Sequence, residues 1–431
     1  MTRQQGQRGG VLTFLTRLSA SIFAMFLSLF PPTVSIASDQ RATSADSIPP
    51  NETVPIADVI NGYQLAQNQK ESLHALVELL QKLFPSEFPS HIHGQTKKDR
   101  EDMFVDTLRP YCDRGAVETV AHTSGPEMLK ALIADNPKAY ISFINKAFRD
   151  ADDLFPDHSK SSLSQGDRLL LVVPGGHLMR DSVRNNIARE VIKAANTKKA
   201  EVEGVIFLPG VRSLYPDEIA MILGAQNTYP ELYEEIRKKF PEKVADLSND
   251  EGQRDNNQKI YKEISESGVF TEKDISQTGF GRFSKDLGNK MVVSLIESKI
   301  HKELYPEGQK QLDRATTRDN AAATADWMTE KGLPDDIKVV LCIDLPFRER
   351  MKNVFASILG LTLKNHVLAT NGTTDTAARM KAFLSHNKKY QFALVNQIYS
   401  IAREHADLTQ IKSALKNKQA SVTKAPLRSL S

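Results

Sequence analysis

Small and charged residues follow the expected strands of this chain, where they could bind an anion. The apolar run RLLLVV (168–173) leads into Gly175 and Gly176, and Arg180 and Asp181 come soon after. Paired glycines let a backbone approach a ligand closely, and the N–H groups at the start of the next helix favour an anion. A tight turn between strand and helix would explain the same residues. The loop lacks the glycine spacing of dinucleotide-binding or Walker-type motifs.

A second apolar run (205–208) ends before Gly210 and Arg212, and Glu218 lies at the start of the following helix. A carboxylate at this position interacts favourably with the helix dipole, so capping alone is a sufficient explanation of Glu218. It could instead hold a ligand hydroxyl or a proton. Glu218 is therefore also our candidate catalytic acid or base.

Two further segments add cations. Thr317 and Asn320 are spaced like a helix cap, with Arg318 between them, and Arg350 follows the strand-like run KVVLCI (338–343). Guanidinium groups bind phosphate and carboxylate in bidentate fashion, so their clustering at strand ends favours a phosphate-bearing or nucleotide-like ligand. No motif specifies a cofactor. The predicted ligand-binding residues are Gly175, Gly176, Arg180, Asp181, Gly210, Arg212, Thr317, Arg318, Asn320 and Arg350.

The elements that would position these residues alternate between strands and helices. Apolar runs bounded by Pro or Gly predict buried strands, and helical periodicity follows each of them. This alternation predicts an α/β fold with a Rossmann-like parallel sheet and crossover helices, in which ligands bind outside the carboxyl ends of the strands. The expected strands are 168–173, 205–208, 338–343 and 366–369. The expected helices around them are 179–197, one from about 216, 318–331, 347–359, 376–385 and 392–404.

Helical regions precede and interrupt this fold. The spacing of apolar residues predicts helices over 59–84, 100–108 and 126–148, and the charged stretch 228–289 indicates a helical insertion or lid. The final residues lack an apolar face, which predicts a disordered tail. The predicted organisation is 1–37 signal peptide, 38–57 flexible leader, 58–165 helical N-terminal region, 166–227 first part of the Rossmann-like domain, 228–289 insertion, 290–410 second part and 411–431 tail.

The N-terminus resembles a secretory signal. A start containing Arg3, Arg8 and Arg17 precedes an apolar run (18–30) and small residues at 35 and 37. This pattern predicts a cleaved signal peptide and a periplasmic or secreted protein. Retention of the run as a membrane anchor, or a mitochondrial transit peptide, are the alternatives.

Composition excludes some classes of partner and site. The formal net charge is +3 with both signs interspersed, so no basic stripe indicates nucleic-acid binding. Cys112 and Cys342 could pair in an oxidising compartment, or Cys342 could be a buried thiol in a strand. His91 and His93 have strand-like spacing without a third ligand nearby, so no metal site is predicted.

The order of these motifs resembles the SanA/ElyC/YdcF family of bacterial envelope-associated proteins. The resemblance covers residues 166–226 and 312–362, and its closest segment is Thr-Arg-Asp-Asn-Ala beginning at Thr317. Phe347 stands where that family has a histidine, and Pro-Gly-Val at 209–211 replaces its Ser-Gly-Gly. The resemblance implies a Rossmann-like domain and a role in the cell envelope, in cell-wall or lipid-linked precursor metabolism.

The function expected from the sequence is that of an exported protein with a Rossmann-like pocket for a phosphate-bearing or nucleotide-like molecule, in proximity to a membrane. Whether it catalyses a reaction, and its oligomeric state, stay open. The alternative is a non-enzymatic secreted interaction protein that uses its N-terminal helices and its insertion, because the resemblance explains neither region.

Overall fold

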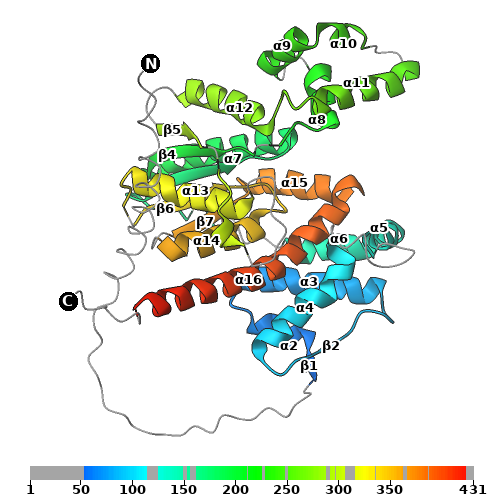
Figure 1. Ribbon diagram of the computed structural model, residues 1–431, viewed down its shortest axis with the longest axis vertical. Helices are drawn as coiled ribbons and strands as arrows, with labels where there is room; N and C mark the ends of the chain where they lie inside the picture. The colour runs from blue at the N-terminus through cyan, green and yellow to red at the C-terminus, as the bar shows by residue number, and fades with distance from the viewer. Residues whose placement is uncertain are drawn as a thin grey trace, which may run out of the picture. The chain divides into compact units, whose positions relative to one another are not determined.

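A five-stranded parallel sheet forms the centre of the computed structural model, which has helices on both faces of the sheet (Figure 1). The structure describes residues 53–113, 125–148, 153–155, 162–210, 212–225, 229–247, 251–287, 292–296, 298–305, 316–334, 336–362, 366–386 and 388–423. The predicted signal peptide lies outside these residues. No helix within the described ranges is long and apolar enough to cross a membrane.

The sheet has the doubly wound strand order β5-β4-β3-β6-β7. From the central strand β3 the chain moves outward through β4 and β5, and then returns to β3's other side with β6 and β7. The order therefore reverses between β3 and β6, as in Rossmann folds. The predicted α/β class and parallel Rossmann-like sheet are confirmed. The strands are β3 (Arg168–Pro174), β4 (Glu201–Leu208), β5 (Val292–Leu295), β6 (Lys338–Cys342) and β7 (His366–Thr370).

Alternate residues of each strand enter different cores, because successive side chains point to opposite faces of a sheet. Leu169 and Leu171 pack with α7 (Leu178–Lys198) on one face, whereas Leu170 and Val172 pack with α13 (Thr317–Glu330) and α14 (Arg348–Thr362) on the other. The central strand β3 is buried on both faces, which is why its residues form a continuous apolar run in the sequence.

The insertion is shorter than the sequence predicted. Its last helix, α12 (Glu272–Leu287), packs against α7, β4 and β5, and Phe283 joins the core beneath the sheet next to Phe207. Thus α12 is the crossover helix from β4 to β5. The strand β5 was missed because it is a four-residue edge strand whose apolar run is too short to separate from its surroundings.

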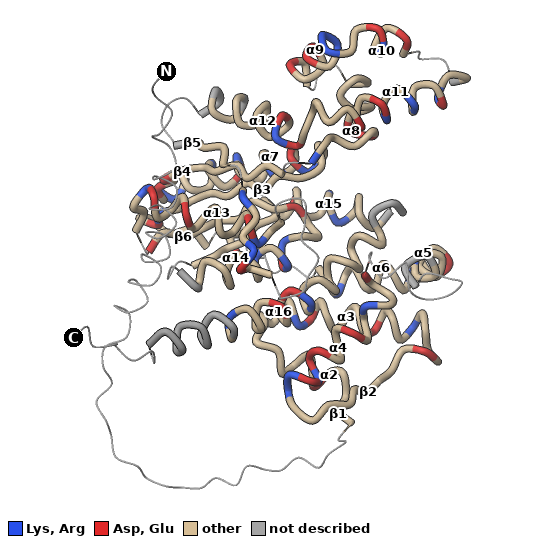
Figure 2. Tube along the Cα trace, viewed as in Figure 1, with Lys and Arg blue, Asp and Glu red and all other residues tan. Residues whose placement is uncertain are grey.

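The rest of the insertion shares one hydrophobic core with the helix that precedes residue 228, and this core includes Ile219, Ile236, Ile264 and Phe270. Acidic and basic residues are interspersed along these helices (Figure 2). The helices are α8 (Pro216–Gly224), α9 (Pro230–Lys239), α10 (Pro241–Ala245) and α11 (Arg254–Glu266), with a short 3-10 turn at Glu251–Gln253.

The N-terminal region is helical, as predicted, but two of its expected helices are divided. The chain is extended near Tyr63 and Ala66, which separates two helices within 59–84, and Pro137 starts a new helix within 126–148. The helices are α2 (Ile56–Gly62), α3 (Gln67–Leu83), α4 (Lys97–Cys112), α5 (Gly125–Asp135) and α6 (Pro137–Ala147). A two-stranded antiparallel sheet joins β1 (Thr53–Pro55) to β2 (His91–His93).

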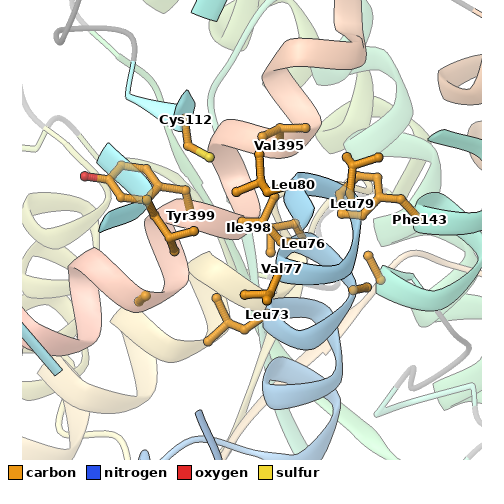
Figure 3. Close-up of a cluster of buried hydrophobic side chains, with 14 of the residues drawn as sticks. Leu73, Leu76, Val77, Leu79, Leu80, Cys112, Phe143, Val395, Ile398 and Tyr399 are labelled. Carbon is orange, nitrogen blue, oxygen red and sulfur yellow. The ribbon is translucent and has the colours of Figure 1, made fainter. Parts of the chain in front are cut away.

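The C-terminal helix α16 (Lys388–Thr423) connects the N-terminal region to the sheet layers (Figure 1). Val395 and Tyr399 pack into the N-terminal core with Leu76 and Leu80 (Figure 3), and Leu408 and Ile411 enter the core over α14. The helix α15 (Thr374–His386) precedes it. Because α16 continues to Thr423, the segment from 411 to 423 is helical where the sequence predicted a disordered tail.

Cys112 and Cys342 are both buried and not joined by a disulfide. Cys112 belongs to the N-terminal core, and Cys342 to the core between α7 and the sheet. Burial raises the pKa of the Cys112 thiol, with Asp113 adding to the effect. The two thiols therefore behave as small hydrophobic side chains.

Candidate functional site

The carboxyl ends of β3 and β6 meet at the point where the strand order reverses, which is where ligands bind in open α/β sheets. Arg184 of α7 spans this point. Its Nε donates to Asp344 Oδ1 at 2.6 Å, and one terminal nitrogen donates to the carbonyl oxygens of Pro174 and Gly175. Arg184 and Asp344 are 2 % and 5 % exposed, so this pair fixes the end of β3 to the loop after β6.

Arg180, one turn before Arg184, stands at the wall of a cavity. Its guanidinium carbon lies 4.2 Å from the centre of the Phe347 ring, and its Nε lies 3.7 Å from Asp344 Oδ2. Such stacking favours a cation over an aromatic face. Phe347 thus supports the orientation of Arg180.

The cavity beside Arg180 has a volume of about 240 Å³ and lies between the start of α7, the loop after β6, and α15. Its wall is mostly apolar, with Arg180, Arg379 and Asp344 as its charged residues. Met179 and Phe383 at this cavity are 40 % and 44 % exposed. An apolar wall with a few charged groups is typical of small-molecule sites. The apolar residues of the wall are Met179, Val183, Leu345, Pro346, Phe347, Met380, Phe383, Leu384 and Ala393.

Glu218 lies in a separate cluster at the ends of β3 and β4, where it is completely buried. It accepts hydrogen bonds from the backbone N–H groups of Leu178 and Tyr215 and from two terminal nitrogens of Arg212. Burial alone would raise the pKa of Glu218, but hydrogen bonds and charge from Arg212 outweigh it and lower the pKa. This geometry fits the capping interpretation. Four donors around an ionised carboxylate leave the predicted acid–base role without structural support.

Gly175 and Gly210 lie against the carboxylate of Glu272, the first residue of α12. Gly176 instead faces Arg184, so the paired glycines do not form one common surface. Asp181, behind this region on α7, is 2 % exposed. Burial, opposed by the charge of Arg184 and reinforced by that of Glu272, raises the pKa of Asp181 to about 6.

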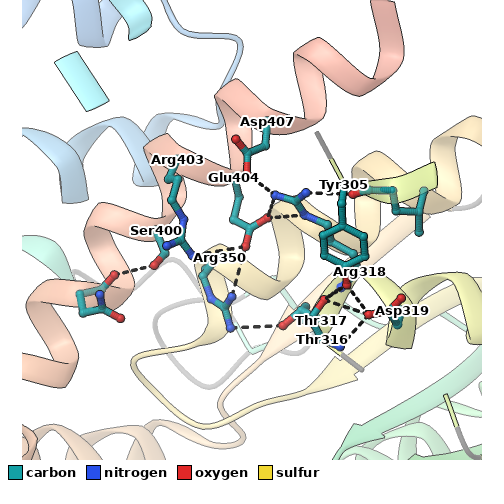
Figure 4. Close-up of polar contacts among 12 residues, drawn as sticks. Tyr305, Thr316, Thr317, Arg318, Asp319, Arg350, Ser400, Arg403, Glu404 and Asp407 are labelled. Atoms are coloured by element: carbon teal, nitrogen blue, oxygen red, sulfur yellow. Dashed lines mark hydrogen bonds and ion pairs between the residues drawn. The ribbon is translucent and has the colours of Figure 1, made fainter. Parts of the chain in front are cut away.

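Arg318 and Arg350 face the C-terminal helix rather than the cavity (Figure 4). Arg318 Nε donates to Glu404 Oε2 at 2.7 Å, and a terminal nitrogen lies 2.6 Å from Asp407 Oδ2. A terminal nitrogen of Arg350 lies 3.5 Å from Glu404 Oε1. Carboxylates of α16 therefore neutralise the two arginines that the sequence predicted as anion clamps.

The remaining predicted residues take part in this packing. Thr317 accepts a hydrogen bond from Arg350 at 3.2 Å, and Asn320 accepts one from Ser298 at 2.7 Å. Thr316, with Asp319 in a capping box, caps the helix in place of Thr317. The predicted ensemble is thus divided into three clusters: the cavity with Arg180, the Glu218–Arg212 cluster and the Arg318–Arg350 cluster.

Four residues important to these clusters were not among the predicted ligand-binding residues: Arg184, Glu272, Asp344 and Glu404. Asp344 was visible as the first charged residue after an apolar strand, a position that could have indicated a role. Arg184 and Glu404 lie inside helices among other charged residues, where only tertiary contacts distinguish them.

The fold places this chain in the class of Rossmann-like α/β proteins, and a cavity lies beside the topological switch point of its sheet. Comparisons with models of protein families, with curated proteins and with solved structures found no match. The resemblance to the SanA/ElyC/YdcF family therefore stays a prediction.

Proposed function

We propose that this chain is an exported envelope protein that binds a small molecule with a phosphate or carboxylate group in the cavity beside Arg180. The observation that carries the proposal is the placement of Arg180 and Arg379 on the wall of a mostly apolar cavity, whose third charged residue is Asp344, outside the carboxyl ends of β3 and β6. A cation at such a wall binds an anionic group, and the apolar surface binds the rest of the molecule.

The apolar wall favours a ligand whose body is largely hydrophobic, and this fits a lipid-linked precursor better than a bare nucleotide. The volume of about 240 Å³ accommodates only part of such a molecule, so the rest would extend past Met179 and Phe383, which are partly exposed. Glu218 is engaged by Arg212 and two backbone N–H groups, so it is assigned no catalytic role and the proposal concerns binding.

Titration calorimetry of the purified chain with farnesyl phosphate, ADP and pyrophosphate tests the proposal. We expect farnesyl phosphate to bind most tightly. Arg180→Ala should weaken its binding by about tenfold, the effect of losing one hydrogen bond to a charged group. Arg237→Ala, on the exposed surface of α9, serves as the matched control. Unchanged affinity in a folded Arg180→Ala variant would refute the proposal.

The second candidate function is that of an interaction protein. It is favoured by the N-terminal helices and the insertion helices, which add two helical regions to the Rossmann-like sheet, each built around a hydrophobic cluster. Met103 and Ile141 are 46 % and 41 % exposed on those N-terminal helices. Capture of a defined partner that persists in Arg180→Ala and is lost in Met103→Asp/Ile141→Asp would favour this function over ligand binding.

A further inference from the structure

The carboxylate of Glu272 lies against the backbone of two glycines, Gly175 after β3 and Gly210 after β4. A Cβ atom on Gly175 would lie 2.5 Å from Glu272 Oε1, and one on Gly210 would lie 2.5 Å from Glu272 Oε2. The absence of side chains at these two glycines is what admits the carboxylate. Each glycine follows a strand of the parallel sheet, at the edge where anions bind in this class of fold.

The groups around this carboxylate are those that bind phosphate. The Gly210 N–H hydrogen-bonds to Glu272, and Arg212 Nε lies 3.2 Å from Glu272 Oε2. A backbone N–H close to a guanidinium, with no side chain in between, is a recurrent arrangement for phosphate oxygens. Arg212 is also held by Glu218 through its terminal nitrogens, so its Nε stays directed at this position.

Holding Glu272 here carries an electrostatic cost. Glu272 is 7 % exposed, and burial raises its pKa, although Arg212 and the Gly210 N–H oppose the rise. Asp181 and Glu218 place two further carboxyl groups near it, which adds repulsion. An incoming anion that displaced Glu272 would recover the same two donors while Glu272 moved into water.

We propose that Gly175, Gly210 and Arg212 form a phosphate-binding cradle that Glu272 occupies as an internal anion, so that a phosphate group binds there only when the start of α12 moves away. The backbone connects this end of α12 to the insertion, and Glu272 N donates to Arg212 O at 2.9 Å. Displacement of Glu272 would therefore couple the occupancy of the cradle to the position of the insertion helices. This cradle is distinct from the cavity beside Arg180.

Inorganic phosphate is the probe, and binding is measured by calorimetry on the full chain. We expect Glu272→Ala to bind phosphate at least about tenfold more tightly than the wild type, because the closed state no longer competes. Adding Gly210→Ala should abolish this gain, since the new Cβ occupies the space that the carboxylate has left. Glu242→Ala, which removes an exposed carboxylate from α10, is the matched control and should behave like the wild type.

Two results would overturn the proposal: phosphate binding by a folded Glu272→Ala variant that is no tighter than that of the wild type, or a gain that survives Gly210→Ala. Circular dichroism establishes folding, and Glu272→Ser replaces Glu272→Ala if the alanine variant does not fold. Arg180→Ala separates the two sites. Loss of phosphate binding in Glu272→Ala/Arg180→Ala assigns the anion to the cavity and refutes the cradle, whereas retained binding supports the cradle whatever the outcome for farnesyl phosphate.

Discussion

Arg184 Nε and Asp344 Oδ1 lie 2.6 Å apart, and this buried ion pair joins α7 to the loop after β6 across the topological switch point. A terminal nitrogen of Arg184 also donates to the carbonyl oxygens of Pro174 and Gly175. It lies next to the cavity wall, so the position of Arg180 and Phe347 depends on it.

Removal of one partner of this pair should be costly. We expect Asp344→Ala to lower the free energy of unfolding by about 3–5 kcal/mol, because the Arg184 guanidinium would be left buried without its counter-charge. Arg184→Met/Asp344→Leu should cost less than Asp344→Ala, since it removes both charges. Urea unfolding of the wild type and of the two variants measures these free energies. A double variant less stable than Asp344→Ala would contradict this account.

Glu404 should make the stability of the chain depend on pH at the acidic end. Burial by itself would raise the pKa of Glu404, but Arg318, Arg350 and Arg403 outweigh it and lower the pKa below its ordinary value of 4.5. Because the folded-state pKa is depressed, the stabilisation is present above 4.5 and is lost as the pH falls through the folded-state pKa. The wild type should therefore be more stable than Glu404→Gln at pH 7, with the difference shrinking on acidification. Urea unfolding at several pH values would show a constant difference if the contact were unimportant.

Asp181 should have the opposite effect on how the stability of the protein depends on pH. Burial raises its pKa from 3.8 to about 6, so the folded protein keeps a proton that the unfolded chain has lost between these values. Stability from this group is thus full below pH 3.8, falls as the pH rises through about 6, and is then constant. Asp181→Asn stays neutral, so its stability relative to the wild type should improve by roughly 2 kcal/mol between pH 4 and pH 7. Urea unfolding of both proteins at the two pH values measures this change. An equal difference in stability between variant and wild type at pH 4 and at pH 7 would rule it out.

Two glycines of α12 provide a matched pair of substitutions. A Cβ on Gly279 would lie 2.7 Å from Asn185 Nδ2 and 3.0 Å from Asp181 Oδ2, whereas a Cβ on Gly281 would meet no atom within 4 Å. Gly279→Ala should destabilise the protein by about 1–3 kcal/mol through overpacking against α7. Gly281→Ala should stabilise it by about 0.5–1 kcal/mol, because alanine is the better helix former. Thermal unfolding of both variants tests the close packing of α12 on α7, and equal midpoints would disprove it.

The local pattern of apolar residues was sufficient to predict the strands whose two faces are both buried. The run RLLLVV predicts β3, and its end at Pro-Gly-Gly is where the strand stops. Glu218 was recognisable as a cap because the residues it caps are its own neighbours in the chain. In contrast, β5 has only four residues at the edge of the sheet, and its identity depends on pairing with β4.

The amino-acid sequence by itself determined the α/β class, the parallel sheet and the strand ends near which charged residues gather, since apolar periodicity and Pro or Gly boundaries are local properties. Only the tertiary structure decided which of the arginines reaches a cavity. Arg318 meets Glu404 across 86 positions of the chain, and Arg184 meets Asp344 across 160. Charges on partners so far apart leave no local signal, because a side chain's partner is set by how helices pack on the sheet.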